Sequence, residues 1–145
     1  MGTQQILMIV VGVIIVGIAV AVGFLVFNSG AYNSNKSAIA TDMQELSTKM
    51  SQFWMLPTSM GGAGRNIVNV TAESVGASLE FTESGGIYKL TNENGEYRVI
   101  SIEDGLVIIG GLGKGTKRGK HPYVEMTADL MTQDVQTELS EKTGF

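Results

Sequence analysis

The stretch ILMIVVGVIIVGIAVAVGFLVF, residues 6–27, decides the fold, because it contains no charged residue and no proline. As a helix rising about 1.5 Å per residue it would be roughly 33 Å long, close to the bilayer hydrocarbon thickness of about 30 Å. A helix that is apolar on every side needs apolar surroundings on every side, and the rest of a 145-residue chain is too small to supply them. We therefore predict a membrane-spanning segment, and a buried core helix is the weaker alternative.

A cleaved secretory signal is the other alternative for this stretch. Such a signal has a basic flank, a shorter apolar run and a small-residue cleavage site. Residues 1–5 carry no basic side chain, the first basic residue is Lys36, and a further helical pattern follows the run. These features favour a retained span, but they leave its orientation undetermined.

Composition excludes several classes of function. The formal net charge is −4 and the sequence pI about 4.9, so we expect no overall attraction to nucleic acid or to an anionic membrane face. The chain has no cysteine, which excludes disulfides, thiolate metal sites and cysteine nucleophiles. We expect no cofactor, no metal site and no enzymatic activity, because no catalytic constellation is recognisable.

A second helical pattern occupies residues 36–56. Its apolar residues are spaced alternately by four and three, which places them in one stripe, and they are Ile39, Met43, Leu46, Met50 and Phe53. We expect the stripe to pack on the C-terminal part of the chain, with docking of a separate partner as the alternative. Residues 28–35 are weak helix formers, so the two helical segments are predicted to be one helix, with a bend or a melted turn between them.

The region after the helices has the pattern of an antiparallel sheet. Residues 57–66 form a connector rich in proline and glycine, which disfavour regular structure. Asn94-Gly95 and Asp104-Gly105 tolerate the positive φ angles of tight hairpins, so residues 87–112 are predicted to form a three-stranded meander. Further strands are predicted in NIVNVTA (66–72), SLEF (78–81), YVEMTADL (123–130) and DVQTEL (134–139).

These patterns predict an α+β fold. A long N-terminal helix (1–56) has a hydrophobic half at about 6–27 and an amphipathic half at about 36–56. It is followed by the connector (57–66) and by a β-rich head (67–145). A head of this size with few large apolar side chains has a marginal core alone, so the amphipathic half is expected to complete that core.

With this layout the chain resembles the type IV pilins and the type II secretion pseudopilins. The segment ILMIVVGVIIVGIAVAVG is similar to the hydrophobic half of the pilin helix, and LPTSMGGAG resembles a loop of bacterial pilin-like proteins. The resemblance implies a structural subunit that is stored in the cytoplasmic membrane and then polymerises into an extracellular helical filament. It also implies a pilus assembly machinery and a prepilin peptidase as partners, besides other copies of the chain.

The N-terminus departs from the pilin pattern. Pilins usually have Glu at the fifth mature position, whereas this chain has Gln5 if Met1 is the mature start, or Leu7 if cleavage occurs between Gly2 and Thr3. The family carboxylate neutralises a neighbour's N-terminal ammonium in an apolar core, where an unpaired charge is costly. Here the amide oxygens of Gln4 and Gln5 are the expected acceptors for that amine.

Two further groups of residues are candidates for contacts between subunits. Small residues on an apolar helix let other helices approach closely. The predicted polymerisation surface consists of Ile6, Leu7, Ile9, Val10, Val13, Ile14, Gly17, Ala21 and Phe24. The second candidate is the basic loop, with Lys114, Lys117, Arg118 and Lys120 beside the surface residue His121. It lacks the Gly-Lys-Ser/Thr of a phosphate loop, and a solvated hairpin tip, adhesion or polyanion contact are its alternatives.

The expected function is accordingly that of a pilin-like filament subunit. The alternatives are a membrane-anchored extracytoplasmic binding protein and a minor pseudopilin of a secretion system.

Overall fold

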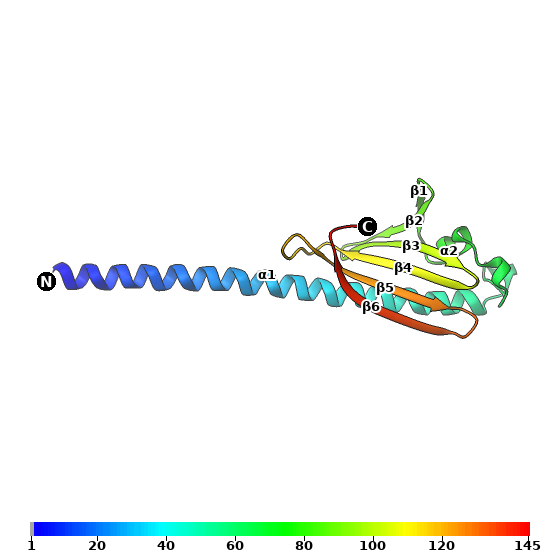
Figure 1. Ribbon diagram of the computed structural model, residues 1–145, viewed down its shortest axis with the longest axis horizontal. Helices are drawn as coiled ribbons and strands as arrows, with labels where there is room; N and C mark the ends of the chain where they lie inside the picture. Colours follow the sequence, from blue (N-terminus) through cyan, green and yellow to red (C-terminus); the bar gives the residue numbers. More distant parts are fainter. Residues whose placement is uncertain (1) are drawn as a thin grey trace.

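The computed structural model describes residues 2–145, and its longest element is the helix α1 (Gly2–Met55) (Figure 1). Its 54 residues correspond to a length of about 80 Å. The helix is unbroken through residues 28–35, where we had expected a bend or a melted turn. In that segment the Asn35 side chain donates to the Asn94 carbonyl (2.7 Å) and accepts from the Gly115 amide (2.9 Å). The head therefore holds weak helix formers in a helical conformation. Met1, one of the two predicted mature starts, lies outside the described residues.

A six-stranded antiparallel sheet covers the C-terminal half of α1, and the N-terminal half projects from the head (Figure 1). The strands lie in the sheet in chain order, each paired with the next. They are β1 (Thr82–Ser84), β2 (Ile87–Thr91), β3 (Gly95–Glu103), β4 (Leu106–Gly113), β5 (His121–Asp129) and β6 (Asp134–Lys142). The predicted α+β class and the predicted meander of residues 87–112 are confirmed.

The core lies between α1 and the middle of the sheet. All five residues of the predicted stripe are buried, and Ile39, Met43 and Met50 have no exposed surface. Their partners come mainly from β4 and β5, where Val107 is paired with Ala128 and Ile109 with Met126. Burying such a side chain stabilises the fold by about 1.5–3 kcal/mol, so the helix completes the core of the head, as predicted.

The segment between the connector and the sheet is helical, and here two strand predictions are wrong. NIVNVTA contains the 3₁₀ helix η2 (Ile67–Asn69), and SLEF begins in the last turn of α2 (Ala72–Ser78). The cause is local capping: Thr71 accepts from the Ser74 amide, and Ser74 accepts from the Thr71 amide. This reciprocal capping box initiates a helix despite the β-branched residues nearby.

The two predicted hairpin turns differ in mechanism. Asp104 and Gly105 have φ of 49° and 82°, as predicted for a tight two-residue turn. Asn94 and Gly95 have no positive φ, so that part of the prediction is wrong. There the Asn92 side-chain oxygen accepts from the amides of Asn94 (2.9 Å) and Gly95 (3.0 Å), and this side chain shapes the turn.

The connector closes the C-terminal end of α1 and includes the short helix η1 (Thr58–Met60). The last carbonyls of an α-helix lack partners within the helix. Here the amides of Ala63, Gly64 and Arg65 donate to the carbonyls of Phe53, Leu56 and Trp54, at 2.8–3.0 Å. The connector thus folds back over the helix end before the chain enters the head.

Candidate assembly interface

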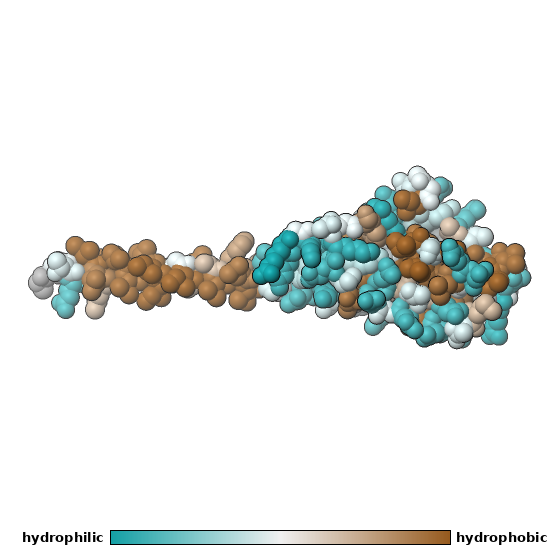
Figure 2. Space-filling view, in the orientation of Figure 1, coloured by the Kyte–Doolittle hydropathy of each residue, from teal (hydrophilic) through white to brown (hydrophobic). Residues whose placement is uncertain are grey.

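The apolar stalk, residues 6–27 of α1, has no contact with the head. Its large side chains are all exposed, from 47% for Val11 to 77% for Met8. Figure 2 shows this half of the molecule as a continuous hydrophobic rod joined to a largely hydrophilic head. The helix α1 is the one helix within residues 2–145 that is long and apolar enough to cross a membrane, and none of its most apolar part is buried.

This exposure overturns the alternative of a buried core helix, because nothing within residues 2–145 covers the stalk. A long apolar helix near an N-terminus is found in membrane anchors and in signal sequences alike. A contiguous apolar surface of this size marks a contact with lipid or with other protein. The stalk is therefore the largest candidate interface of the molecule.

The predicted polymerisation residues lie along this stalk, and all of them are exposed. Adding a β-carbon at Gly12, Gly17 or Gly23 would meet no other atom within 4 Å. These glycines are therefore not required by the chain's own packing. Before the stalk, Gly2, Thr3, Gln4 and Gln5 form the exposed start of α1, and the two glutamines have open space around them for the predicted role.

Asp42 of α1 is hydrogen-bonded to three residues of the head. Its Oδ2 atom accepts hydrogen bonds from the side-chain Nδ2 groups of Asn92 and Asn94, both at 2.8 Å, and from the Tyr97 hydroxyl at 2.6 Å. Burial raises the pKa of Asp42, but the hydrogen bonds from Tyr97, Asn94 and Asn92 outweigh it and lower that pKa below its ordinary value. Burial and the same hydrogen bond raise the pKa of Tyr97.

Tyr32 provides a second tie between helix and head, nearer the stalk. Its hydroxyl donates to Glu141 Oε1 at 2.9 Å, and its ring is almost fully buried. Burial, followed by the hydrogen bond and charge of Glu141, raises the pKa of Tyr32 to about 12. The hydroxyl thus stays protonated and remains a donor at physiological pH.

The predicted basic loop is an ordered hairpin. Lys117 and Lys120 exchange two backbone hydrogen bonds of 2.9 and 3.1 Å, and the two residues between them, Arg118 and Gly119, have φ of 54° and 75°. This is the geometry of a tight two-residue turn, in which the glycine adopts positive φ without steric cost. We call residues 114–120 the basic hairpin.

The basic hairpin lies at the end of the head nearest the stalk. It projects along α1 toward the N-terminus (Figure 1), and the Lys117 Nζ atom lies 5.8 Å from the centre of the Tyr32 ring. Its four basic side chains are exposed, and none of the ion pairs found among residues 2–145 includes them. His121 follows at the start of β5, where its Nδ1 lies 2.9 Å from the Gly113 carbonyl, so it is half-buried rather than a free surface residue.

The opposite end of the head is acidic. The β3–β4 and β5–β6 turns lie beside each other there, joined by a hydrogen bond from the Leu130 amide to the Gly105 carbonyl. The carboxylates of these turns are those of Glu103, Asp104, Asp129 and Asp134. A strand of eight residues such as β4 spans about 26 Å, which is several times the Debye length of about 8 Å at physiological salt. The two charged ends are therefore too far apart to neutralise each other within one chain.

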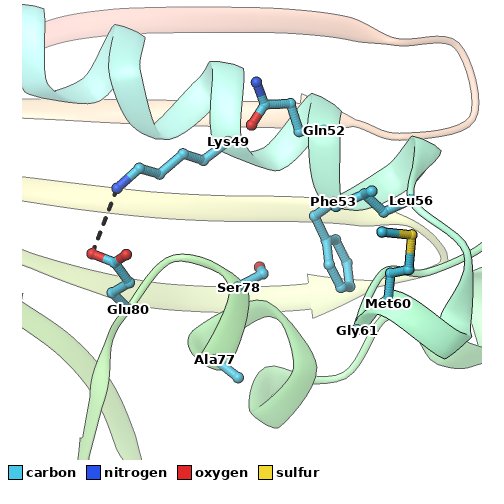
Figure 3. Close-up of a pocket in the computed structure, with 9 residues that line it drawn as sticks. All are labelled: Lys49, Gln52, Phe53, Leu56, Met60, Gly61, Ala77, Ser78 and Glu80. Atoms are coloured by element: carbon cyan, nitrogen blue, oxygen red, sulfur yellow. Dashed lines mark ion pairs between the residues drawn. The ribbon is translucent and has the colours of Figure 1, made fainter.

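An open hollow of about 450 Å³ lies between α1, η1 and α2 (Figure 3). Phe53, Leu56 and Met60 lie at one end of it, and Lys49 reaches toward Glu80 at the other, with Nζ and Oε2 3.8 Å apart. Lys49 and Glu80 are the titratable residues that line the hollow. Across residues 2–145 no group of three or more His, Cys, Asp or Glu side chains is placed to hold a metal ion.

The structure thus brings together residues that sequence reasoning did not connect. Asp42 is 50 to 55 residues from its three partners, and Tyr32 is 109 residues from Glu141. One signal was available for Asp42, which is a charged residue directly beside the buried stripe position Met43. No pattern in the sequence pointed to its partners.

Neither the family models nor the curated proteins nor the solved structures with which this chain was compared match it.

Proposed function

We propose that this protein is a pilin-like structural subunit of an extracellular helical filament, which polymerises through its N-terminal apolar helix. The observation that carries the proposal is the stalk, an all-round apolar helix that projects from a folded head and is not covered by any other part of residues 2–145. Such a surface needs an apolar environment at every stage. Lipid supplies it before assembly, and a bundle of neighbouring stalks supplies it afterwards.

The glycines of the stalk support the second of these environments. A lipid anchor alone gains nothing from small residues, whereas helices that pack on one another approach closely at glycine and alanine. Gly17 and Ala21 are four residues apart and therefore lie on one face, within the predicted polymerisation surface.

The polarity of the head supports an open assembly. A basic surface at one end and an acidic surface at the other are complementary between copies stacked along the helix axis. Such a head-to-tail contact is heterologous, and a heterologous contact that does not close into a ring produces a helical filament. The basic hairpin would then face the acidic turns of the next subunit.

Electron microscopy of material sheared from the surface of cells that express the protein tests this proposal, with the chain identified in the filaments by antibody labelling. We expect filaments that contain it and a membrane-embedded pool of unassembled subunit. If the purified protein is monomeric in detergent and the cells carry no such filaments, the protein would instead be an anchored binding protein. A few copies within a filament of another subunit would indicate a minor pseudopilin.

A further inference from the structure

The basic hairpin and the end of the stalk lie at the same level along α1. Tyr32, over whose ring Lys117 lies, follows the last stalk residue Phe27 by five residues, which is about 7.5 Å along the helix axis. The polar headgroup layer of a bilayer is about 5–8 Å thick on each side of the hydrocarbon core. When residues 6–27 span that core, the basic hairpin therefore lies at headgroup level.

The charge at this end of the head is predominantly positive. Six of the ten basic residues of the chain are here: Lys36, Lys114, Lys117, Arg118, Lys120 and Lys142, which pairs with His121 in the sheet. The carboxylates at this end include Glu93 in the β2–β3 turn, Asp42 beneath that turn and Glu96, which pairs with Arg98. Glu141 is also here, where it accepts from Tyr32 and lines a hollow with Lys117, Arg118 and Lys120. The net charge of −4 is compatible with this positive surface, because most carboxylates of the head lie elsewhere.

We propose that the basic hairpin docks on the anionic phospholipid headgroups of the leaflet that faces the head while the stalk spans the membrane. This inference rests on the membrane-inserted form in the proposed function and does not require polymerisation. The partner is a lipid surface rather than a soluble anion, because the charges are spread over the tip of a hairpin. Lys117, Arg118 and Lys120 line an open hollow with Glu141, but all four residues are exposed, so the hollow contains no buried donor that would hold a soluble anion.

The docked state has a consequence for assembly. A subunit that leaves the bilayer loses the anionic surface under the hairpin, and a neighbouring head offers the acidic turns in its place. The four basic side chains of the hairpin thus exchange one anionic partner for another. They keep a counter-charge when the subunit leaves the bilayer.

Site-specific fluorescence in the full chain tests the docking, since a protein without cysteine accepts a single label site. Thr116→Cys places a fluorophore in the hairpin, and Thr132→Cys places one in the distant β5–β6 turn as a control. The proteins are inserted at low density into phosphatidylcholine vesicles with and without phosphatidylglycerol. Quenching by a headgroup-attached quencher lipid then reports how close each label lies to the surface.

We expect strong quenching at residue 116 in the anionic vesicles only, and weak quenching at residue 132 in both lipid compositions. The quenching at residue 116 should be lost near 1 M salt, because the Debye length there is only about 3 Å. Each basic side chain near an anionic surface contributes about a fivefold factor to binding, so Lys117→Gln with Arg118→Gln should lower the docked-to-undocked ratio roughly 25-fold. The matched pair Arg65→Gln with Lys89→Gln removes the same charge away from the hairpin and should leave the ratio unchanged.

Quenching at residue 116 that is equal in both lipid compositions, or that survives the Lys117 and Arg118 substitutions, would overturn the docking. The docking would also be overturned if protection of the residue-116 label from the quencher depended on protein density and was accompanied by cross-linking between copies. The hairpin would then contact protein rather than lipid. Insertion of the stalk is scored separately by vesicle flotation. A chain that fails to float refutes the membrane-inserted form itself, whereas one that floats without hairpin quenching refutes only the docking.

Discussion

At the scale of single residues, Asp42 shows how one carboxylate ties a head to a helix. One oxygen atom of Asp42 accepts three hydrogen bonds from the β2–β3 turn and from β3, which lie some fifty residues later in the sequence. The Tyr97 hydroxyl among these donors belongs to a side chain with no exposed surface. Removal of the acceptor therefore leaves a donor with little access to water.

We expect Asp42→Ala to lower the free energy of unfolding of the head by about 1–3 kcal/mol. Glu45→Ala, one turn further along α1, removes an exposed ion pair with Lys49 and should cost less than about 1 kcal/mol. Denaturant unfolding in detergent, followed by fluorescence of Trp54, the only tryptophan and a core residue, measures both. Equal losses for the two variants would show that Asp42 does not tie the head to the helix.

The lowered pKa of Asp42 predicts a pH dependence. The folded-state pKa lies below the unfolded value of about 3.9, so the contribution of this carboxylate is present above that value and is lost as the pH falls through the folded pKa. Asp42→Asn does not titrate, so its unfolding free energy should decline less on acidification from pH 6 to about pH 3. Parallel curves for the two proteins would contradict this assignment.

At the scale of elements, the connector determines how the chain turns from helix to head. Gly62 is buried against the end of α1, and a β-carbon there would lie 2.1 Å from the Leu56 carbonyl oxygen. That oxygen belongs to backbone already held by the Gly64 amide, so it has little freedom to move. The position thus admits only glycine without rearrangement of the turn.

Gly62→Val should therefore destabilise the head by about 1–3 kcal/mol or more. Gly30→Ala is the control, since a β-carbon at that exposed helical position meets no atom within 4 Å. It should leave stability unchanged or raise it by up to about 1 kcal/mol. Thermal unfolding followed by circular dichroism compares them, and an unchanged midpoint for Gly62→Val would mean that the connector relaxes freely.

At the scale of the whole molecule, the surfaces proposed for assembly are separate from the core. The head is closed by the amphipathic half of α1, while the stalk and the two charged ends face outward. Under the proposed function, substitutions in the stalk should consequently change assembly without changing the folded subunit.

Gly17→Leu tests this separation. The isolated subunit has room for the new side chain, so its unfolding midpoint and membrane insertion should match those of the wild type. If stalks pack closely in a filament, the added bulk costs about 1–3 kcal/mol per subunit and filament yield should fall sharply. Ile15→Leu conserves volume and should assemble normally, and normal yield for Gly17→Leu would exclude close packing at this position.

Charge reversal in the basic hairpin tests the head-to-tail contact. Exposed ion pairs contribute about 0–1 kcal/mol and are screened by salt, so Lys117→Glu should lower filament stability most at low ionic strength. Lys89→Glu changes the charge equally but lies in β2, outside the hairpin, and should have little effect. Shearing resistance measured across a salt series distinguishes the two, and identical curves would place the hairpin outside the contact.

The sequence alone determined the features that depend on local pattern. The apolar run of residues 6–27, the five-residue stripe and the Asp104-Gly105 turn each carry their signal within a few residues, because hydrophobic periodicity and turn geometry are short-range properties. From these the α+β layout, the meander and the packing of α1 on the head could all be predicted. The expectation of no overall attraction to an anionic membrane face rests on net charge, which contains no information on where the charges lie.

Only the tertiary structure decided what depends on contacts between distant segments. Pairing across 50 to 109 residues placed Asp42 under the β2–β3 turn and Tyr32 against Glu141. These contacts kept α1 continuous through weak helix formers, because the hydrogen bonds of a docked head offset a poor intrinsic propensity. The antiparallel register then sent the basic turn to one end of the sheet and the acidic turns to the other. The polarity of the head arises from that arrangement, since residues that are scattered in the chain share an end only after the strands have paired.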